Sequence, residues 1–301
     1  MHILKSYFTG LRQAGGRGKM VALLWIFNLL FAAVVYRLAA AFFSQAFGSS
    51  AVAEDLLHGF DTALFLEMLV HNPGPQALVF KAMVFLGFLY FWVSLFLTGG
   101  ILQVLSAPAR PEGDASPAQR FASRFFQGAG KFFGRFFRLA LYSLILWVGL
   151  AVFQFLLYTA AKPLTGGGTD EKMMVIMFWV WVGSGLVLYF FISMVLDYAR
   201  ISIVLSDTRR VLRALFRALG FVLKRLLRTS TLYAMLLLTG LAIFLLYWAI
   251  HSMIPTHSLA SIWLAFAIGQ IFILSRGWLK IAFQAAQLEF YRTRGTLDIT
   301  A

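Results

Sequence analysis

Six long apolar runs divide this chain, and polar connections separate them. A helix needs about 20 residues to cross the hydrocarbon core of a bilayer, and every run reaches that length. The seven prolines lie between the runs or at their edges, so the pattern predicts unbroken helices. The predicted spans cover residues 20–43, 78–105, 139–161, 173–196, 230–250 and 258–283.

The connections between the runs differ in kind. Residues 44–77 form a long connection in which "EDLLHGFDTALFLEML" predicts an amphipathic helix and "HNPGP" predicts a turn. Residues 106–118 are rich in proline and polar residues, which is typical of a flexible linker. The segment "PLTGGGTD" predicts a tight turn. We therefore expect an all-α bundle of six transmembrane helices.

Composition supports a membrane protein. Hydrophobic residues make up 60% of the 301 residues and charged residues only 13%, whereas soluble domains are about half apolar and a quarter charged. The net charge of +14 would be compatible with binding to nucleic acid. However, the cations lie between apolar runs, where they orient a protein in a bilayer. The absence of cysteine excludes disulfides, thiolate catalysis and cysteine metal sites.

The distribution of cations predicts the topology. Of the 26 Lys and Arg residues, 22 lie in residues 1–19, 106–138, 197–228 and 276–301, which alternate with the other connections. Positively charged connections remain in the cytoplasm. We therefore expect both termini to be cytoplasmic, in a bacterial inner membrane.

Two basic stretches have the pattern of amphipathic helices. In residues 120–138 five cations share one helical face and seven phenylalanines share the opposite one. Rings in the acyl boundary and cations at headgroups are typical of an interfacial helix, whereas single-stranded nucleic acid needs both on one face. The simpler interpretation is that residues 120–138 form a root for the third span, that is, a helix that leads into this span and positions it. Residues 209–228 repeat the pattern. The candidate contacts with anionic lipid are Arg120, Arg124, Lys131, Arg135, Arg213, Arg217, Lys224 and Arg225.

Internal repeats organise the chain further. The stretch "ILQVLS" at 101–106 matches "ISIVLS" at 201–206, and "DYARIS" at 197–202 is similar to "GWLKIA" at 277–282. These matches predict three tandem units, each a basic amphipathic helix followed by a hairpin of two spans. The units would cover about 1–105, 118–205 and 208–290, within one membrane domain of residues 1–301.

With six spans, basic helices before the odd spans and "DYAR" at the end of span four, the chain resembles a loose group of uncharacterised bacterial membrane proteins. It is similar to the membrane module that precedes the catalytic domain in some glycerophosphodiester phosphodiesterases. The resemblance covers most of the chain and implies an auxiliary or lipid-related role. The phosphodiesterase catalytic domain is missing from the sequence, so the resemblance does not imply that activity.

Candidate chemistry is sparse in the predicted spans. Their centres hold no ionisable residue, and only the amides Asn28, Gln154 and Gln270 reach mid-depth, where interhelical hydrogen bonds explain them. Asp197 and Arg200 lie one turn apart where the fourth span ends. Their pattern predicts a local ion pair, with a gate or a partner contact as the sharper alternative.

Two further groups of polar side chains are candidate binding sites. One face of the sixth helix carries Arg276, Lys280, Gln284 and Gln287. Their long side chains could simply reach the membrane interface, or they could contact an anionic headgroup. Asp55, His58 and Asp61 recur at a spacing of three, which matches no strong metal motif. We therefore predict no metal, no cofactor and no catalytic residue.

The sequence favours a non-catalytic membrane module that assists a partner or interacts with lipid. A permease or channel for a small or lipidic solute is the alternative. The expected partners are membrane lipids, with anionic headgroups at the inner leaflet, and not nucleic acid. A protein partner or a second copy of the chain stays open.

Overall fold

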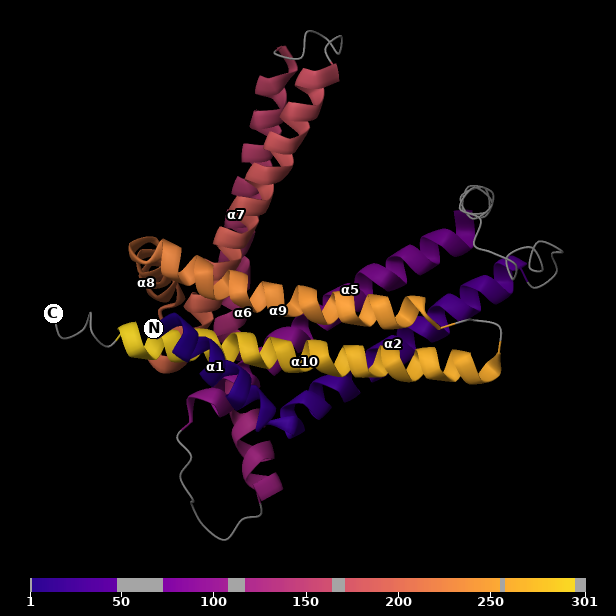
Figure 1. Cartoon of the computed structure of the whole chain (residues 1–301), viewed down its shortest axis with the longest axis horizontal. Helices are drawn as coiled ribbons and strands as arrows, with labels where there is room; N and C mark the ends of the chain where they lie inside the picture. The colour runs from indigo at the N-terminus through magenta and orange to yellow at the C-terminus, as the bar shows by residue number, and fades with distance from the viewer. Residues whose placement is uncertain (1, 48–72, 108–116, 164–170, 255–257, 296–301) are drawn as a thin grey trace. The chain divides into compact units, whose positions relative to one another are not determined.

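The computed structural model describes residues 2–47, 73–107, 117–163, 171–254 and 258–295. All the regular structure in these ranges is helical. The helices, labelled in Figure 1, are α1 (His2–Gly15), α2 (Gly18–Phe47), α5 (Pro73–Ser106), α6 (Pro117–Ala161), α7 (Glu171–Leu205), α8 (Val211–Lys224), α9 (Leu226–Ser252) and α10 (Leu259–Gly295).

The predicted class of fold is confirmed. Six helices of the described chain are long and apolar enough to cross a membrane, namely α2, α5, α6, α7, α9 and α10. Most of the connection 44–77, most of the linker 106–118 and the "TGGGTD" turn lie outside the described residues, as do Asp55, His58 and Asp61.

Contacts divide the chain into two compact units. The first unit comprises Met1–Val21 together with Thr98–Ala301, and the second comprises Ala22–Leu97. In the second unit the ring of Tyr90 stacks on Phe27 with centroids 5.6 Å apart. The Tyr90 hydroxyl donates to Asn28 Oδ1 at 3.3 Å. The interhelical hydrogen bond predicted for Asn28 is thus confirmed.

Buried side chains of the first unit gather at one end of its helices, which we call the base. In α7 the buried residues fall between Met194 and Val204. In α9 they are Thr229, Leu232 and Leu236, all near its start. Apart from Ser261, the buried side chains of α10 lie between Ile281 and Phe290. The outer parts of these helices bury little against the chain and carry exposed apolar side chains, as lipid-facing helices do.

Helix α6 agrees with one of the two interpretations of its basic stretch, the root for the third span, and differs from the other. The basic stretch and the third span form one continuous helix of 45 residues, instead of an interfacial helix followed by a span. Phe125, Phe132 and Phe136 are fully buried in the base, so this part of the phenylalanine face packs on protein. The physical reason is that these rings have helix ends to pack on, and burial among neighbouring helices replaces burial in the acyl boundary.

Each basic helix of the first unit bridges the ends of two others. Helix α1 lies along α10 (Figure 1), where Gly10 meets Ala286 so closely that a Cβ on Gly10 would sit 2.5 Å from the Ala286 Cβ. The first half of α6 packs on the end of α5, where Gly128 leaves room for Gln103. Helix α8 packs on the end of α7, and its Phe221 meets Phe290 of α10 with ring centroids 6.0 Å apart.

The basic helices and the helix ends on which they pack form a ring, and side-chain hydrogen bonds close it. Arg17, just after α1, donates from Nη1 to the Val104 carbonyl of α5 at 2.7 Å. Arg292 of α10 donates from Nη2 to the Ser106 carbonyl at 2.5 Å. The last four carbonyls of a helix have no partner within it, and cations stabilise its negative end. The two arginines therefore cap α5 and tie it to α1 and α10.

A polar clasp joins α6 to α7 within the membrane-spanning part. Gln154 Nε2 donates to the Trp181 carbonyl at 3.1 Å, and Trp181 Nε1 donates back to the Gln154 carbonyl at 3.1 Å. A Cβ on Gly185 would collide with Gln154 Nε2. The interhelical role predicted for Gln154 is confirmed, and Gly185 is the residue that admits its side chain.

We expect Gly185→Leu to weaken this hairpin by about 1 kcal/mol, because it displaces Gln154 and an interhelical hydrogen bond in a membrane contributes about that much. The measurement is unfolding of the purified protein in a graded detergent denaturant, followed by circular dichroism. Gly183→Leu is the matched control, since no atom lies within 4 Å of a Cβ at Gly183. Equal stability of the two variants would show that the hydrogen bonds between Gln154 and Trp181 do not stabilise the hairpin.

Candidate functional site

Helix α8 has three distinct faces. One is buried in the base and consists of Val211, Ala214, Ala218, Phe221 and Val222. Beside it runs an exposed apolar strip whose main members are Leu212, Phe216 and Leu223. A third strip carries Arg213, Arg217 and Lys224, all exposed. Residues spaced by four or seven positions share a helical face, so the cations form a row next to the apolar strip.

The buried face explains why α8 sits where it does. Small residues such as Ala214 and Ala218 let its backbone come close to α7, while Phe221 meets Tyr198 with ring centroids 5.1 Å apart. The guanidinium of Arg225 lies 4.9 Å from the centre of the Phe221 ring, a distance typical of a cation–π contact. Arg225 is therefore placed on the base, apart from the exposed row.

Two other candidate lipid contacts have a partner within the chain. Lys131 Nζ and Arg135 Nη1, both on α6, donate to the Asp207 carboxylate at 2.8 and 2.6 Å. Hydrogen bonds from Lys131 and Arg135 hold the pKa of Asp207 below its ordinary value. The Arg135 side chain is 10% exposed and that of Asp207 is 56% exposed, so these contacts fasten α6 to the turn after α7.

Asp207 also determines the shape of this turn. Its φ of 45° lies in the left-handed region, which aspartate tolerates better than most residues with a side chain. The sequence alone does not reveal this role of Asp207. The available signal was the spacing of Lys131 and Arg135, which puts both on one helical face, but nothing in the sequence paired that face with residue 207.

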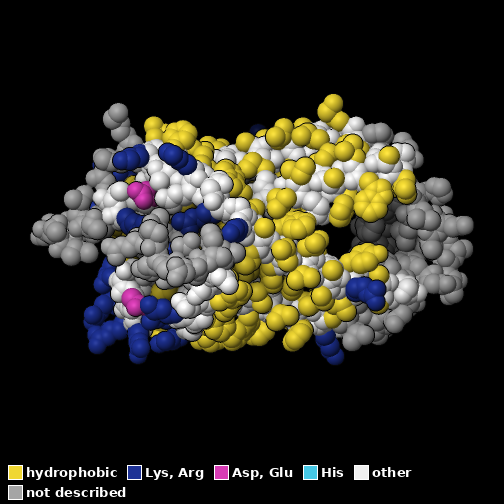
Figure 2. Space-filling view, turned by 90° about the horizontal axis from the view of Figure 1, so that it is seen from below, with side chains coloured by type: hydrophobic (Ala, Val, Ile, Leu, Met, Phe, Trp, Pro, Cys, Tyr) yellow, Lys and Arg dark blue, Asp and Glu magenta, His cyan; other side chains and the backbone are white. Residues whose placement is uncertain are grey.

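The remaining candidate contacts are distributed more widely. Arg124 is half-buried on α6, while the side chain of Arg120 lies outside the described residues. The eight predicted residues therefore do not form one site. The structure brings Arg213, Arg217 and Lys224 together on the exposed face of α8 and places Lys131 and Arg135 against Asp207. Figure 2 shows many Lys and Arg side chains gathered in one part of the visible face, while a few others lie among hydrophobic side chains.

A second polar cluster lies where α7, α9 and α10 meet. Arg200 Nη1 donates to Asp197 Oδ1 at 2.8 Å, which is the ion pair predicted within α7. Gln287 of α10 donates a hydrogen bond from Nε2 to Asp197 Oδ2 at 3.4 Å. Lys280 of α10 and Tyr233 of α9 are within electrostatic reach of both Asp197 and Arg200. The sequence grouped the α10 residues on one face but did not predict that Asp197 would face them.

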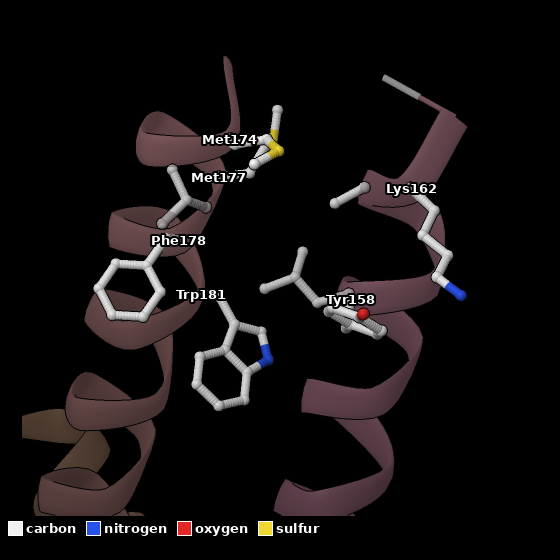
Figure 3. Close-up of a pocket in the computed structure, with 9 residues that line it drawn as sticks. Tyr158, Lys162, Met174, Met177, Phe178 and Trp181 are labelled. Carbon is white, nitrogen blue, oxygen red and sulfur yellow. The ribbon is translucent and has the colours of Figure 1, made fainter. Parts of the chain in front are cut away.

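A groove of about 390 Å³ lies between the outer ends of α6 and α7. Its lining is apolar and includes Met174, Met177, Phe178 and Trp181 (Figure 3). The ammonium of Lys162 lies 5.6 Å from the centre of the Tyr158 ring, at the other wall of this groove. Such a surface suits a hydrocarbon chain better than a polar solute.

Within the described residues no three His, Asp or Glu side chains are placed to hold a metal ion. Comparisons with protein-family models, with curated proteins and with solved structures find no match to this chain. The similarity to the membrane modules of phosphodiesterases therefore stays a prediction from the sequence pattern. The class that the fold defines is an integral membrane protein with six helices able to span the bilayer.

Proposed function

We infer that the protein is a non-catalytic integral membrane module that interacts with anionic lipid at the inner leaflet of a bacterial inner membrane, with both termini in the cytoplasm. The observation that carries this proposal is α8, where the exposed cation row lies beside an exposed apolar strip. An aqueous surface would leave Leu212 and Phe216 in contact with water, at a cost in free energy. A membrane interface accommodates both strips at once.

Electrostatics supports the same orientation. A cation close to an anionic leaflet contributes about 1 kcal/mol, and salt screens part of this. Arg213, Arg217 and Lys224 project from one face of α8, so all three can reach headgroups together. Lys131 and Arg135 contribute less to lipid binding in this proposal, because Asp207 already offsets part of their charge.

The ring of helices supports three tandem units as the plan of this module. Helix α1 packs on α10, the first half of α6 packs on α5, and α8 packs on α7. The basic helix of each repeat thus lies on the second span of the repeat before it. The basic helix of the first repeat lies on the second span of the last repeat, so the order is closed. This closed order is the one that a threefold arrangement of repeats requires.

A permease for a small or lipidic solute is the alternative function. The groove between α6 and α7 favours it, because its methionine and aromatic lining would accept an acyl chain. Against a path through the base stand its fully buried side chains, among them Phe132, Phe136 and Tyr198. We therefore favour the lipid-interacting module.

We expect the triple substitution of Arg213, Arg217 and Lys224 by glutamine to reduce the preference for anionic lipid by roughly five- to tenfold, after allowing for screening. Native mass spectrometry measures this preference as the ratio of retained phosphatidylglycerol to phosphatidylcholine, starting from an equimolar mixture. The matched control replaces Arg138, Arg209 and Arg228, which are also exposed but lie outside α8. Equal losses in the two triple variants would show that the row has no special role.

A further inference from the structure

The polar cluster of α7, α9 and α10 is unusual because it lies at the boundary between an apolar span and the base. The apolar part of α7 runs up to Asp197, and the apolar part of α10 ends at Arg276. The side chains of Asp197 and Arg200 are 28% and 32% exposed. This cluster is therefore accessible from one side and sheltered on the other. In the topology proposed above, this boundary coincides with the inner headgroup level.

The charges of the cluster are not balanced. Arg200 contacts the carboxylate of Asp197 directly, and Lys280 lies within electrostatic reach of the same carboxylate. Asp197 accepts hydrogen bonds from Arg200 and from Gln287, while the ammonium of Lys280 takes part in the cluster through its charge. Two cations against one anion leave an excess positive charge in a half-buried place, and a half-buried charge favours a counter-ion.

A buried acceptor lies next to this excess charge. Gln284 is one turn beyond Lys280 on the same face of α10, and its Oε1 is buried without a hydrogen-bond partner among the described residues. Buried polar atoms nearly always have a partner, so the site calls for a hydrogen-bond donor as well as an anion. A phosphate diester whose headgroup carries a hydroxyl or an ammonium group supplies both.

The surface beyond the cluster is apolar. Farther toward the outer end of the Asp197 face of α7, beyond Ser193 and Met194, lie Phe190 and Leu186, and Leu186 is exposed. On α10 the guanidinium of Arg276 lies 6.0 Å from the centre of the Phe272 ring. A ligand whose charged end meets Lys280 would therefore have hydrocarbon surface beside the rest of its length. A soluble anion gains nothing from that surface, but an acyl chain does.

We propose that Lys280 and Arg200 bind the phosphate of one phospholipid, that Gln284 accepts a hydrogen bond from its headgroup, and that an acyl chain lies along the Leu186 face of α7. This site rests on the lipid-interacting function proposed above and makes it specific. It is separate from the α8 row, which would attract many anionic lipids without selecting one. Asp197 then competes with the phosphate for the two cations.

Because of that competition, removing a cation and removing the carboxylate should change lipid retention in opposite directions. We expect Lys280→Met to lower the retention of one tightly held phosphatidylglycerol by about five- to tenfold, and Asp197→Asn to raise it by a similar factor. Native mass spectrometry of the full chain, released from micelles containing phosphatidylglycerol and phosphatidylcholine, counts the lipids that survive increasing collisional activation. Gln284→Leu should reduce the preference for phosphatidylglycerol, because phosphatidylcholine has no headgroup donor to lose.

Two controls keep the proposal open to failure. Lys280→Arg should restore retention if charge is what matters, and circular dichroism of each variant shows whether the helices are intact. If Asp197→Asn and Lys280→Met both lower retention, the cluster only holds helices together, and the proposal is wrong. If inorganic phosphate protects the protein from heat as well as phosphatidylglycerol does, the ligand is a soluble anion, and the lipid part is wrong.

The outcome is also distinguishable from that of the α8 experiment. Loss of one retained lipid in Lys280→Met, with an unchanged bulk preference for anionic lipid, would support this site alone. Loss of the bulk preference in the α8 triple variant, with the one lipid still retained, would support the proposed function alone. No retained lipid in the unaltered protein would overturn the inference, whatever the α8 variant does.

Discussion

Gly10→Ala should lower the free energy of unfolding by about 2 kcal/mol, because a methyl group at this position overpacks the contact between α1 and α10. A Cβ on Gly10 would lie 2.5 Å from the Ala286 Cβ, 2.7 Å from its backbone nitrogen and 2.8 Å from its Cα. Two of these three atoms belong to the backbone, so no side-chain rotation relieves the collision. We expect α1 to shift away from α10.

Hydrogen exchange of residues 2–15 measures this displacement directly, since an undocked helix exchanges its amides faster. The matched control is Gly15→Ala in the same helix, where a Cβ would meet nothing within 4 Å. Alanine there should be neutral or slightly stabilising. Ala286→Gly should restore only part of the stability of Gly10→Ala, because the backbone atoms remain. Unchanged exchange in Gly10→Ala would show that α1 does not pack as described.

Asp207→Asn should destabilise the base by roughly 1 to 2 kcal/mol, toward the lower end of the cost of leaving a buried polar group without its partner. The reason is that Arg135, whose side chain is only 10% exposed, loses the carboxylate that accepts its hydrogen bond. Solvent screening at the exposed Asp207 keeps the effect from being larger. Chemical denaturation of the purified protein provides the measurement.

Asp207→Ala should cost about 1 kcal/mol more, because alanine tolerates the left-handed φ of 45° less well than asparagine does. Asp207→Gly removes the charge but relaxes the backbone, so it should resemble Asp207→Asn. If all three variants are as stable as the unaltered protein, the contacts with Lys131 and Arg135 contribute nothing.

The same carboxylate gives a pH dependence with a defined sign. Hydrogen bonds from Lys131 and Arg135 lower the pKa of Asp207 below its ordinary value of 3.8. A carboxyl whose pKa is lower in the folded state stabilises the fold at pH values above its ordinary pKa. Its contribution is lost as the pH falls from about 4 through the lowered value. Between pH 6 and 8 we expect no change from this group, and Asp207→Asn should abolish the acid-dependent part.

Much of the fold could be predicted because a bilayer imposes simple rules on the sequence. Each apolar run long enough to span it became a helix, and Pro73 and Pro117 each begin a helix, where a proline interrupts no hydrogen bond. The mid-span amides Asn28 and Gln154 were also predictable as interhelical partners, because an amide in hydrocarbon needs one.

For the basic stretch of α6 the sequence indicated an interfacial helix and also a root for the third span, and the continuous helix α6 agrees with the second interpretation. Glycines and a strong amphipathic pattern favour an interfacial helix when the helix is considered alone. In the folded chain Gly128 is where α5 approaches most closely, and Phe125 is buried beside Gly100. The pattern shows that a face must be covered, but it does not show whether lipid or protein covers it.

The candidate sites were the least predictable part. The pairing of Lys131 and Arg135 with Asp207, and of Gln287 with Asp197, joins residues that are 72 to 90 positions apart. Periodicity places residues on faces of their own helices, but it does not determine which face of another helix they meet. The ion pair within α7 was predictable only because Asp197 and Arg200 are one turn apart.

The contact of α1 with the last helical hairpin has a consequence for biosynthesis. The Tyr7 and Thr239 hydroxyls lie 2.8 Å apart although 232 positions separate them in the chain. At synthesis rates of about 5 to 20 residues per second, α1 waits roughly 10 to 50 seconds before its partners leave the ribosome. During that interval its apolar face must be shielded by lipid or by a chaperone. A chain that lacks α9 and α10 would therefore leave this face of α1 without its partners.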